Sequence, residues 1–204
     1  EGYALWFESR MKLAMPLLEK RAFAAKAAKV DDLPARKWKS PLQKCVQALK
    51  CHRDVMFAEN PDGKPISIII TTLAATAYRG EQDVGSAIQN ILATMGSFVN
   101  QQRPRVPNPV NPSEDFADKW YDSKYAHLKL EQNFNWWLQQ AQEDFATIGQ
   151  SRDADFIAEQ VREKFASSID AVSLRDRLGL GAATIITAPK SHNIEAPAKP
   201  WMHR

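Results

Sequence analysis

Four prolines stand within ten residues, from 103 to 112, and this stretch most limits how the chain can fold. Proline lacks a backbone N–H and disfavours helical geometry in the residue before it, so irregular structure is expected there. Other prolines divide the chain in the same way. Pro16 predicts a break in a helical segment at 1–28, and residues 60–63 predict a turn after a helix at 41–58. The sequence therefore predicts helices separated by proline-containing connections.

The helix at 41–58 has the clearest start signal. Ser40 is a typical N-cap residue, and Pro41 suits the first helical position. Apolar residues then recur with the helical period, as they also do over 83–99. Ser113 is expected to cap a further short helix that ends at Trp120.

The segment 66–78 is ambiguous from its pattern alone. Its Ile and Thr residues are typical of a buried strand, whereas the alanines that follow them favour a buried helix. Two further helices are expected at 123–149 and 153–178. The predicted fold class is thus all-α, a helical bundle lobe at 1–180 followed by an extended tail at 181–204.

The composition excludes several classes of protein. No apolar stretch among the 204 residues approaches the ~20 residues that a membrane-spanning helix needs. Cys45 and Cys51 are too few for a disulfide scaffold and predict free thiols in the cytoplasm, and together with His52 they lack a fourth ligand at zinc spacing. The first 60 residues carry 12 Lys and Arg against 7 Asp and Glu. This bias indicates either a solvated surface or an anion site for phosphates.

The usual enzyme motifs are missing from the sequence. It contains no Gly-rich phosphate loop, no dinucleotide-binding glycine pattern and no nucleophile elbow. The acidic pairs at 31–32 and 153–155 stand where helices are expected to begin, so capping is a better interpretation than metal binding. One aromatic cluster has helical spacing and indicates core packing rather than base stacking: Phe134, Trp136, Trp137 and Phe145.

Residues 40–54 and 64–75 resemble the C-terminal helical half of the bacterial cGAS/DncV-like nucleotidyltransferases (CD-NTases). These enzymes are relatives of animal cyclic GMP-AMP synthase and of the oligoadenylate synthases. Residues 1–7 are similar to the segment that follows the family's catalytic sheet, and residues 108–120 are similar to the Asn/Asp-Pro loop before its closing helices. The resemblance covers roughly the first 150 residues.

The resemblance implies an all-helical lobe packed against a mixed-sheet catalytic lobe, with nucleotides in the cleft between them. It therefore implies that 66–78 is a helix. The family's catalytic lobe carries a Gly-Ser loop and three carboxylates that hold two Mg²⁺ ions, and those sites lie upstream of anything in this chain. We therefore expect the chain to be the C-terminal half of a longer enzyme, with the N-terminal catalytic lobe as its partner.

The resemblance also implies which residues contact nucleotide. The family places a lysine from a helix like 41–58 on the triphosphate of the donor nucleotide, and Lys50 matches it. A serine early in the next helix contacts the same phosphates, and Ser67 matches it. Arg53 follows Lys50 by three residues, so it shares roughly the same helix face and is expected to assist. Cys51 stands where relatives are expected to have a basic residue. The alternatives are a solvated Lys50 and a Ser67 that is only an N-cap or a buried hydroxyl.

The implied function is synthesis of cyclic di- or trinucleotide second messengers from nucleoside triphosphates in antiviral defence, with Mg²⁺ held by the catalytic lobe. Two alternatives are a free-standing helical binding module without catalysis and the lobe of a linear oligoadenylate-type synthase.

The tail is a further expected site of interaction. Some members of the family have their C-terminus joined to other molecules by a companion ubiquitin-transfer-like enzyme. A conjugating or regulatory defence protein is therefore an expected partner of the tail, in which 182–187 lie against the body and 189–204 are extended. A tail that only wraps the surface is the alternative.

The missing carboxylates give a first prediction. Incubated with ATP, GTP and Mg²⁺, the 204-residue chain is expected to release no pyrophosphate above background, because two-metal nucleotidyl transfer needs those ligands. A coupled pyrophosphate assay measures this. Product formation at an enzymatic rate would show that the active site has been misplaced.

Overall fold

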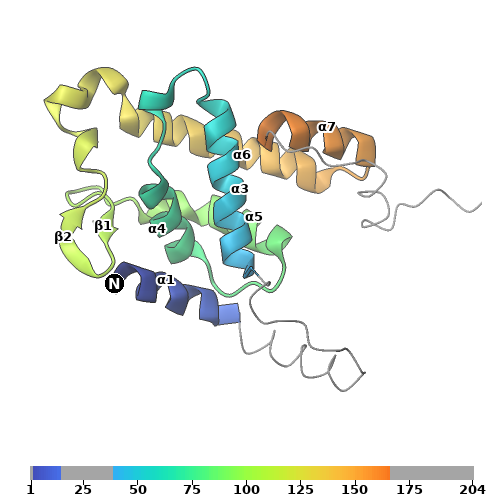
Figure 1. The fold of residues 1–204 in the computed structure, drawn as a ribbon, viewed down its shortest axis with the longest axis horizontal. Coiled ribbons are helices and arrows are strands. Elements are labelled where there is room, and N and C mark those ends of the chain that lie inside the picture. The colour runs from blue at the N-terminus through green and yellow to red at the C-terminus, as the bar shows by residue number, and fades with distance from the viewer. Residues whose placement is uncertain (1, 15–38, 166–204) are drawn as a thin grey trace, which may run out of the picture.

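The computed structural model describes residues 2–14 and 39–165. Its helices pack around the helix at 41–56, and a short hairpin covers one side of the molecule (Figure 1). In chain order the elements are α1 (Gly2–Met11), η1 (Lys12–Ala14), α3 (Pro41–Met56), η3 (Pro61–Gly63), α4 (Ser67–Ala77), α5 (Val84–Thr94), η4 (Met95–Phe98), β1 (Pro107–Asn108), β2 (Asn111–Asp115), η5 (Asp118–Trp120), η6 (Ser123–Leu128), α6 (Leu130–Gln150) and α7 (Ala154–Phe165).

Helix α3 begins where the sequence predicts. The Ser40 hydroxyl accepts from the Gln43 N–H at 3.2 Å, and the Gln43 side chain accepts from the Ser40 N–H at 2.8 Å. This reciprocal pair is a capping box, and it satisfies two donors that the helix itself cannot. The apolar face that follows, including Leu42 and Leu49, is fully buried. The predicted helix at 41–58 is confirmed, with its regular part ending at Met56.

The ambiguous segment 66–78 forms helix α4, as the resemblance implied and the strand pattern did not. Ile70 and Ala74 are completely buried, and most other residues of α4, on all its faces, are buried too. A helix that is apolar on all sides is stable only when other elements enclose it. α1, α3, α5 and η4 all contact α4, and this explains why a run of β-branched residues remains helical here.

Residues 107–115 correct two predictions from the sequence. The proline-rich stretch contains the antiparallel pair β1–β2, with Pro107 opposite Asp115, and Ser113 lies within β2 rather than capping a helix. Only a single turn, η5, forms before Tyr121. The side chain of Asp115 organises this region by accepting hydrogen bonds from the N–H groups of Arg105, Val106 and Ala117 and from the Tyr121 hydroxyl. Burial disfavours the ionised carboxyl, but these bonds outweigh it and lower the pKa of Asp115.

The closing helices follow the sequence prediction with one interruption. The expected helix at 123–149 is divided into η6 and α6 by Lys129, which has a left-handed φ of 52°. α7 begins at Ala154, where the Asp153 carboxylate accepts from the N–H groups of Asp155 and Phe156. The capping interpretation of Asp153 is thereby confirmed.

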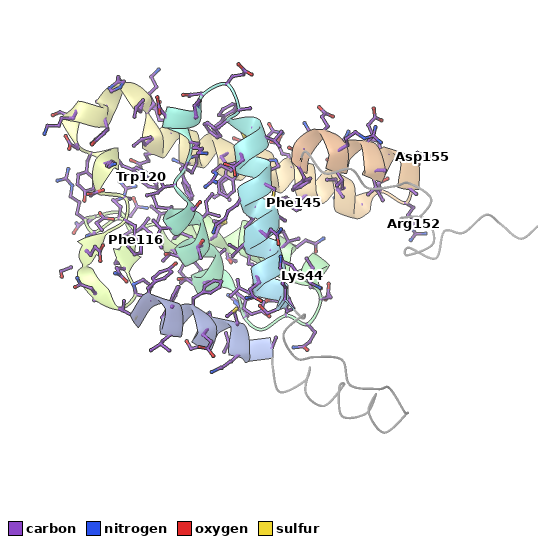
Figure 2. The ribbon with its side chains drawn as sticks, viewed as in Figure 1. Lys44, Phe116, Trp120, Phe145, Arg152 and Asp155 are labelled. Atoms are coloured by element: carbon purple, nitrogen blue, oxygen red, sulfur yellow. The ribbon has the colours of Figure 1, made fainter. Side chains whose placement is uncertain are left out.

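Three of the four clustered aromatics pack as predicted. Phe134 and Trp137 belong to the core, and Phe145 packs between α6 and α7 (Figure 2). Trp136 is the exception, because its side chain is 54% exposed. It makes a T-shaped ring contact with Phe57.

Several predictions lie outside the described residues: the helical segment beyond residue 14, the acidic pair at 31–32, the end of the 153–178 helix and the whole tail from 181. Within the described ranges, no helix has both the length and the apolar character to cross a membrane.

A buried hydrogen bond between His52 and Asp144 joins α3 to α6. Nε2 of His52 lies 2.9 Å from Oδ2 of Asp144, and Nζ of Lys164 from α7 lies 3.9 Å from the other carboxylate oxygen. Phe145 and Phe165 pack against the imidazole. Burial lowers the pKa of His52 more than Asp144 raises it. A second proton added at the buried Nδ1 would also find no acceptor among the described residues.

This contact predicts a pH-dependent stability. Because the folded-state pKa of His52 lies below its ordinary value of 6.5, the unfolded chain binds the proton more readily. The contribution to stability is complete above about pH 6.5 and decreases as the pH falls toward the folded-state pKa. Thermal melts at pH 7.5 and 5.5 should therefore show a larger drop in Tm for the wild type than for His52→Gln. The exposed His127 provides the control, because His127→Gln should leave the wild-type drop unchanged.

Candidate functional site

The first turn of α4 is open to a ligand. Its N-cap residue is Ile66, which has no side-chain group to accept from the N–H groups of that turn. Ser67, the first helical residue, is exposed, and Nη1 of Arg53 donates to its hydroxyl oxygen at 2.9 Å. This helix start therefore presents unsatisfied donors beside a hydroxyl whose position is fixed.

Arg53 reaches Ser67 from inside the protein. It is only 4% exposed, and Nη1 also donates to the Pro65 carbonyl at 3.0 Å. Its Nε and Nη2 donate to one carboxylate oxygen of Asp54, which also accepts from Nζ of Lys64 at 3.1 Å. Burial opposes ionisation of Asp54, but these hydrogen bonds outweigh it and lower its pKa. One carboxylate thus balances two cations.

Lys50 lies almost one turn before Arg53 on α3. Its ammonium makes no hydrogen bond or ion pair with any residue that the structure describes. Burial, followed by repulsion from Arg53, lowers the pKa of Lys50, and the attraction of Asp54 offsets this only in part. A partly buried cation that forms no direct ion pair with a described residue is an arrangement that an anion would stabilise.

Lys50 lines a pocket of about 330 Å³ between α1, α3 and α4, which we call the Lys50 pocket. Thr71 contributes from α4, one turn after Ser67, and its hydroxyl donates to the Ser67 carbonyl at 2.8 Å. Phe7 contributes an aromatic ring from α1, and Cys51 lies beside Lys50. The complete lining is Phe7, Gln43, Val46, Gln47, Lys50, Cys51 and Thr71.

The structure brings Arg53 and Ser67 into contact and places Lys50 in a pocket beside Thr71, and the three predicted site residues differ in exposure. Ser67 is accessible and Lys50 is partly accessible, whereas the guanidinium of Arg53 is enclosed by protein groups. Sequence reasoning missed Lys64 and Thr71. The spacing of Thr71, four residues after Ser67 and hence on the same helix face, was the signal that could have found it.

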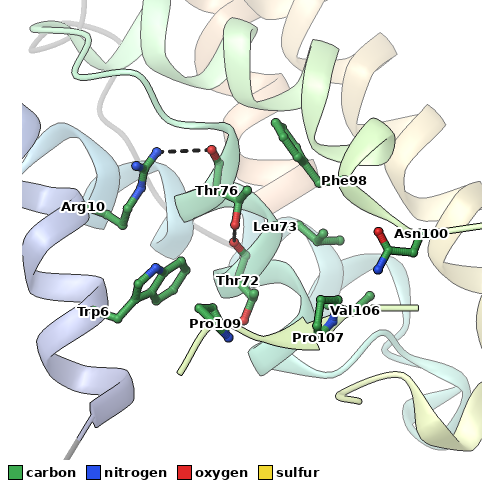
Figure 3. A pocket seen from close by; sticks show the side chains of 10 residues that line it. All are labelled: Trp6, Arg10, Thr72, Leu73, Thr76, Phe98, Asn100, Val106, Pro107 and Pro109. Atoms are coloured by element: carbon green, nitrogen blue, oxygen red, sulfur yellow. Dashed lines mark hydrogen bonds between the residues drawn. The ribbon is translucent and has the colours of Figure 1, made fainter. Parts of the chain in front are cut away.

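A second pocket, the Trp6 pocket, lies on another side of α4 and measures about 380 Å³ (Figure 3). It is lined by Trp6, Thr72, Thr76 and Asn100 among others, together with Arg10. Arg10 donates to the carbonyls of Ala75, Thr76 and Tyr78 at the end of α4. Because the guanidinium of Arg10 already donates to these carbonyls, the Trp6 pocket is poorly suited to bind phosphate.

The two cysteines provide a probe of the Lys50 pocket. Cys45 is fully buried, and burial together with Glu81 and Asp83 raises its pKa to about 12. Cys51 is a partly exposed free thiol. Iodoacetamide at pH 8 should alkylate Cys51 in the folded protein and both thiols in urea, because the accessible thiolate is the nucleophile. Trypsin cuts after Lys50, so mass spectrometry reads the two sites separately; equal labelling of both in the native protein would contradict the described burial.

Known proteins provide an independent comparison. No family model matches the chain. It is 35% identical over 135 residues to a c-di-GMP synthase of Roseivirga ehrenbergii, covering 63% of this chain and 35% of that protein. It is 30% identical over 127 residues to the cyclic dinucleotide synthase CdnG of Bradyrhizobium diazoefficiens, covering 57% of this chain and 30% of that protein. The chain thus spans about a third of the length of these curated relatives.

A solved structure also has a similar fold. The structure of the Bradyrhizobium diazoefficiens CD-NTase CdnG in complex with GTP matches with a TM-score of 0.57 and 20% identity, covering 87% of this chain and 54% of that one. The resemblance that residues 40–54 and 64–75 suggested is therefore confirmed: the chain is similar in sequence to proteins named as cyclic dinucleotide synthases and similar in fold to a CD-NTase.

Proposed function

We propose that the chain is the helical lobe of a nucleotidyltransferase that makes cyclic di- or trinucleotides from nucleoside triphosphates in antiviral defence, and that it holds the triphosphate of the donor nucleotide. The observation that carries this proposal is Lys50, a partly buried cation whose pKa is lowered and which lines a pocket together with Thr71, one turn into α4. The relatives named as cyclic dinucleotide synthases support the reaction class.

Charge supports an anionic ligand at this site. Lys50, Arg53 and Lys64 outnumber the single carboxylate of Asp54, so the neighbourhood of Ser67 carries a positive excess. An ammonium is a compact partner for phosphate oxygens, and free N–H groups at a helix start add further donors. A bound triphosphate would raise the lowered pKa of Lys50 again, so binding and protonation of this lysine reinforce each other.

The reaction assigns different tasks to the two lobes. A ribose hydroxyl attacks the α-phosphate, the bond to the leaving oxygen breaks, and pyrophosphate departs. Among the described residues, no group of three or more His, Cys, Asp or Glu could hold a metal ion. In this proposal Mg²⁺ belongs to the catalytic lobe, as the resemblance implies, and we derive no metal-dependent step here. In this chain Lys50 and Ser67 bind and orient the triphosphate.

Titration of the chain with GTP tests the binding role. Lys50→Ala removes a charge-assisted contact worth about 1.5–3 kcal/mol, so affinity should fall about ten- to a hundredfold. NMR shifts of the Ser67 and Thr71 amides measure this, and GTP should also slow alkylation of Cys51. The matched control is Lys44→Ala, which removes the same charge from an exposed position near the start of α3 (Figure 2). Unchanged affinity of Lys50→Ala would refute the assignment.

Product analysis tests the reaction. A protein that carries this lobe together with a catalytic lobe is incubated with the four nucleoside triphosphates and Mg²⁺, and its products are identified by mass spectrometry. Cyclic products support the proposal and linear oligoadenylates support the related synthase. GTP binding without any product identifies a binding module.

A further inference from the structure

The contacts of Arg53 point to a task different from direct nucleotide binding. We propose that Arg53 is a positioning residue that orients the Ser67 hydroxyl as a hydrogen-bond donor to the phosphate of the ligand. This inference rests on the proposed function, because it names the device that prepares that same site. It differs from the sequence expectation, in which Arg53 assists Lys50 by touching the nucleotide.

Arg53 is enclosed by protein groups. Its side chain is about 5% exposed, and its three nitrogens donate to Asp54, Pro65 and Ser67 at distances of 2.8 to 3.1 Å. Four of the five guanidinium N–H groups can be assigned to these contacts. A guanidinium held in this way has little surface left for a ligand, so its influence on one must pass through a neighbour.

The chemistry of the Arg53–Ser67 contact has only one direction. A guanidinium carries donors and no acceptor, so the Ser67 oxygen must accept from Nη1. A hydroxyl has one proton of its own, and that proton finds no acceptor among the described residues. The O–H of Ser67 therefore remains available as a donor on the exposed side of the helix start, where a phosphate oxygen is an acceptor.

The same nitrogen also fixes the backbone that leads into α4. Nη1 donates to the carbonyl of Pro65, two residues before Ser67. Asp54 accepts from the opposite edge of the guanidinium, and Lys64 donates to the same carboxylate oxygen. Backbone and hydroxyl are thus fixed by one buried group, so the orientation of Ser67 does not have to be established when the ligand binds.

A double-mutant cycle with inorganic tripolyphosphate as the probe tests this coupling. Arg53→Lys keeps the charge but loses the forked geometry, so long-range attraction is unchanged. In the wild-type background it should weaken tripolyphosphate binding about threefold, and in the Ser67→Ala background it should change binding by less than about 1.5-fold. NMR titration gives the dissociation constants, and circular dichroism establishes that each variant is folded. Equal losses in the two backgrounds would overturn the inference.

A second measurement needs no substitution at Arg53. The side-chain ¹⁵N signals of Arg53 should shift when tripolyphosphate binds to the wild type and should remain in place in Ser67→Ala. Signals that move equally in both proteins would show direct contact with phosphate and would refute the positioning role. If the wild type binds no tripolyphosphate at all, the proposed function itself fails, which is distinguishable from binding without coupling.

Discussion

Two arginines hold the two ends of the buried helix α4. Arg53 of α3 donates to the chain entering the helix and to its first residue, and Arg10 of α1 donates to the carbonyls at its last turn. The carbonyls at the buried last turn of α4 cannot rely on water, and Arg10 supplies donors to them. The free groups at the exposed first turn are N–H donors, which an arginine cannot satisfy, so Arg53 instead fixes the Pro65 carbonyl and the Ser67 hydroxyl. The two arginines thus tie α1 and α3 to opposite ends of α4, and the candidate site lies at the end that keeps free N–H donors.

The sequence predicts this fold well where the signal is local. The capping box at Ser40 and the apolar stripe of 83–99 involve residues a few positions apart, and both helices form. The hairpin at 107–115 was missed because its organiser, Asp115, binds N–H groups and a hydroxyl that no spacing rule connects. The choice between strand and helix at 66–78 needed either the resemblance or the surrounding helices, since burial on all sides erases periodicity.

The candidate site shows the same limit at the level of single residues. Lys50 and Arg53 have the same charge and neighbouring positions on one helix. The sequence therefore predicts that both contact the nucleotide, with Arg53 assisting Lys50. In the fold Lys50 forms no direct ion pair with a described residue, whereas Arg53 is buried and donates to Ser67. The difference arises from Pro65 and Ser67, which come from a later segment and meet only one of the two cations.

Helix α1 is attached differently from the other helices, and this affects both pockets. None of its residues is fully buried, and polar contacts from Arg10 and Tyr3 supplement the partial packing of Trp6 and Phe7. These two adjacent aromatics line different pockets, Trp6 one and Phe7 the other. A local opening of α1 would therefore widen both cavities at once, without unfolding the core of α3 and α4. Hydrogen exchange at the α1 amides thus reports the accessibility of the two cavities together.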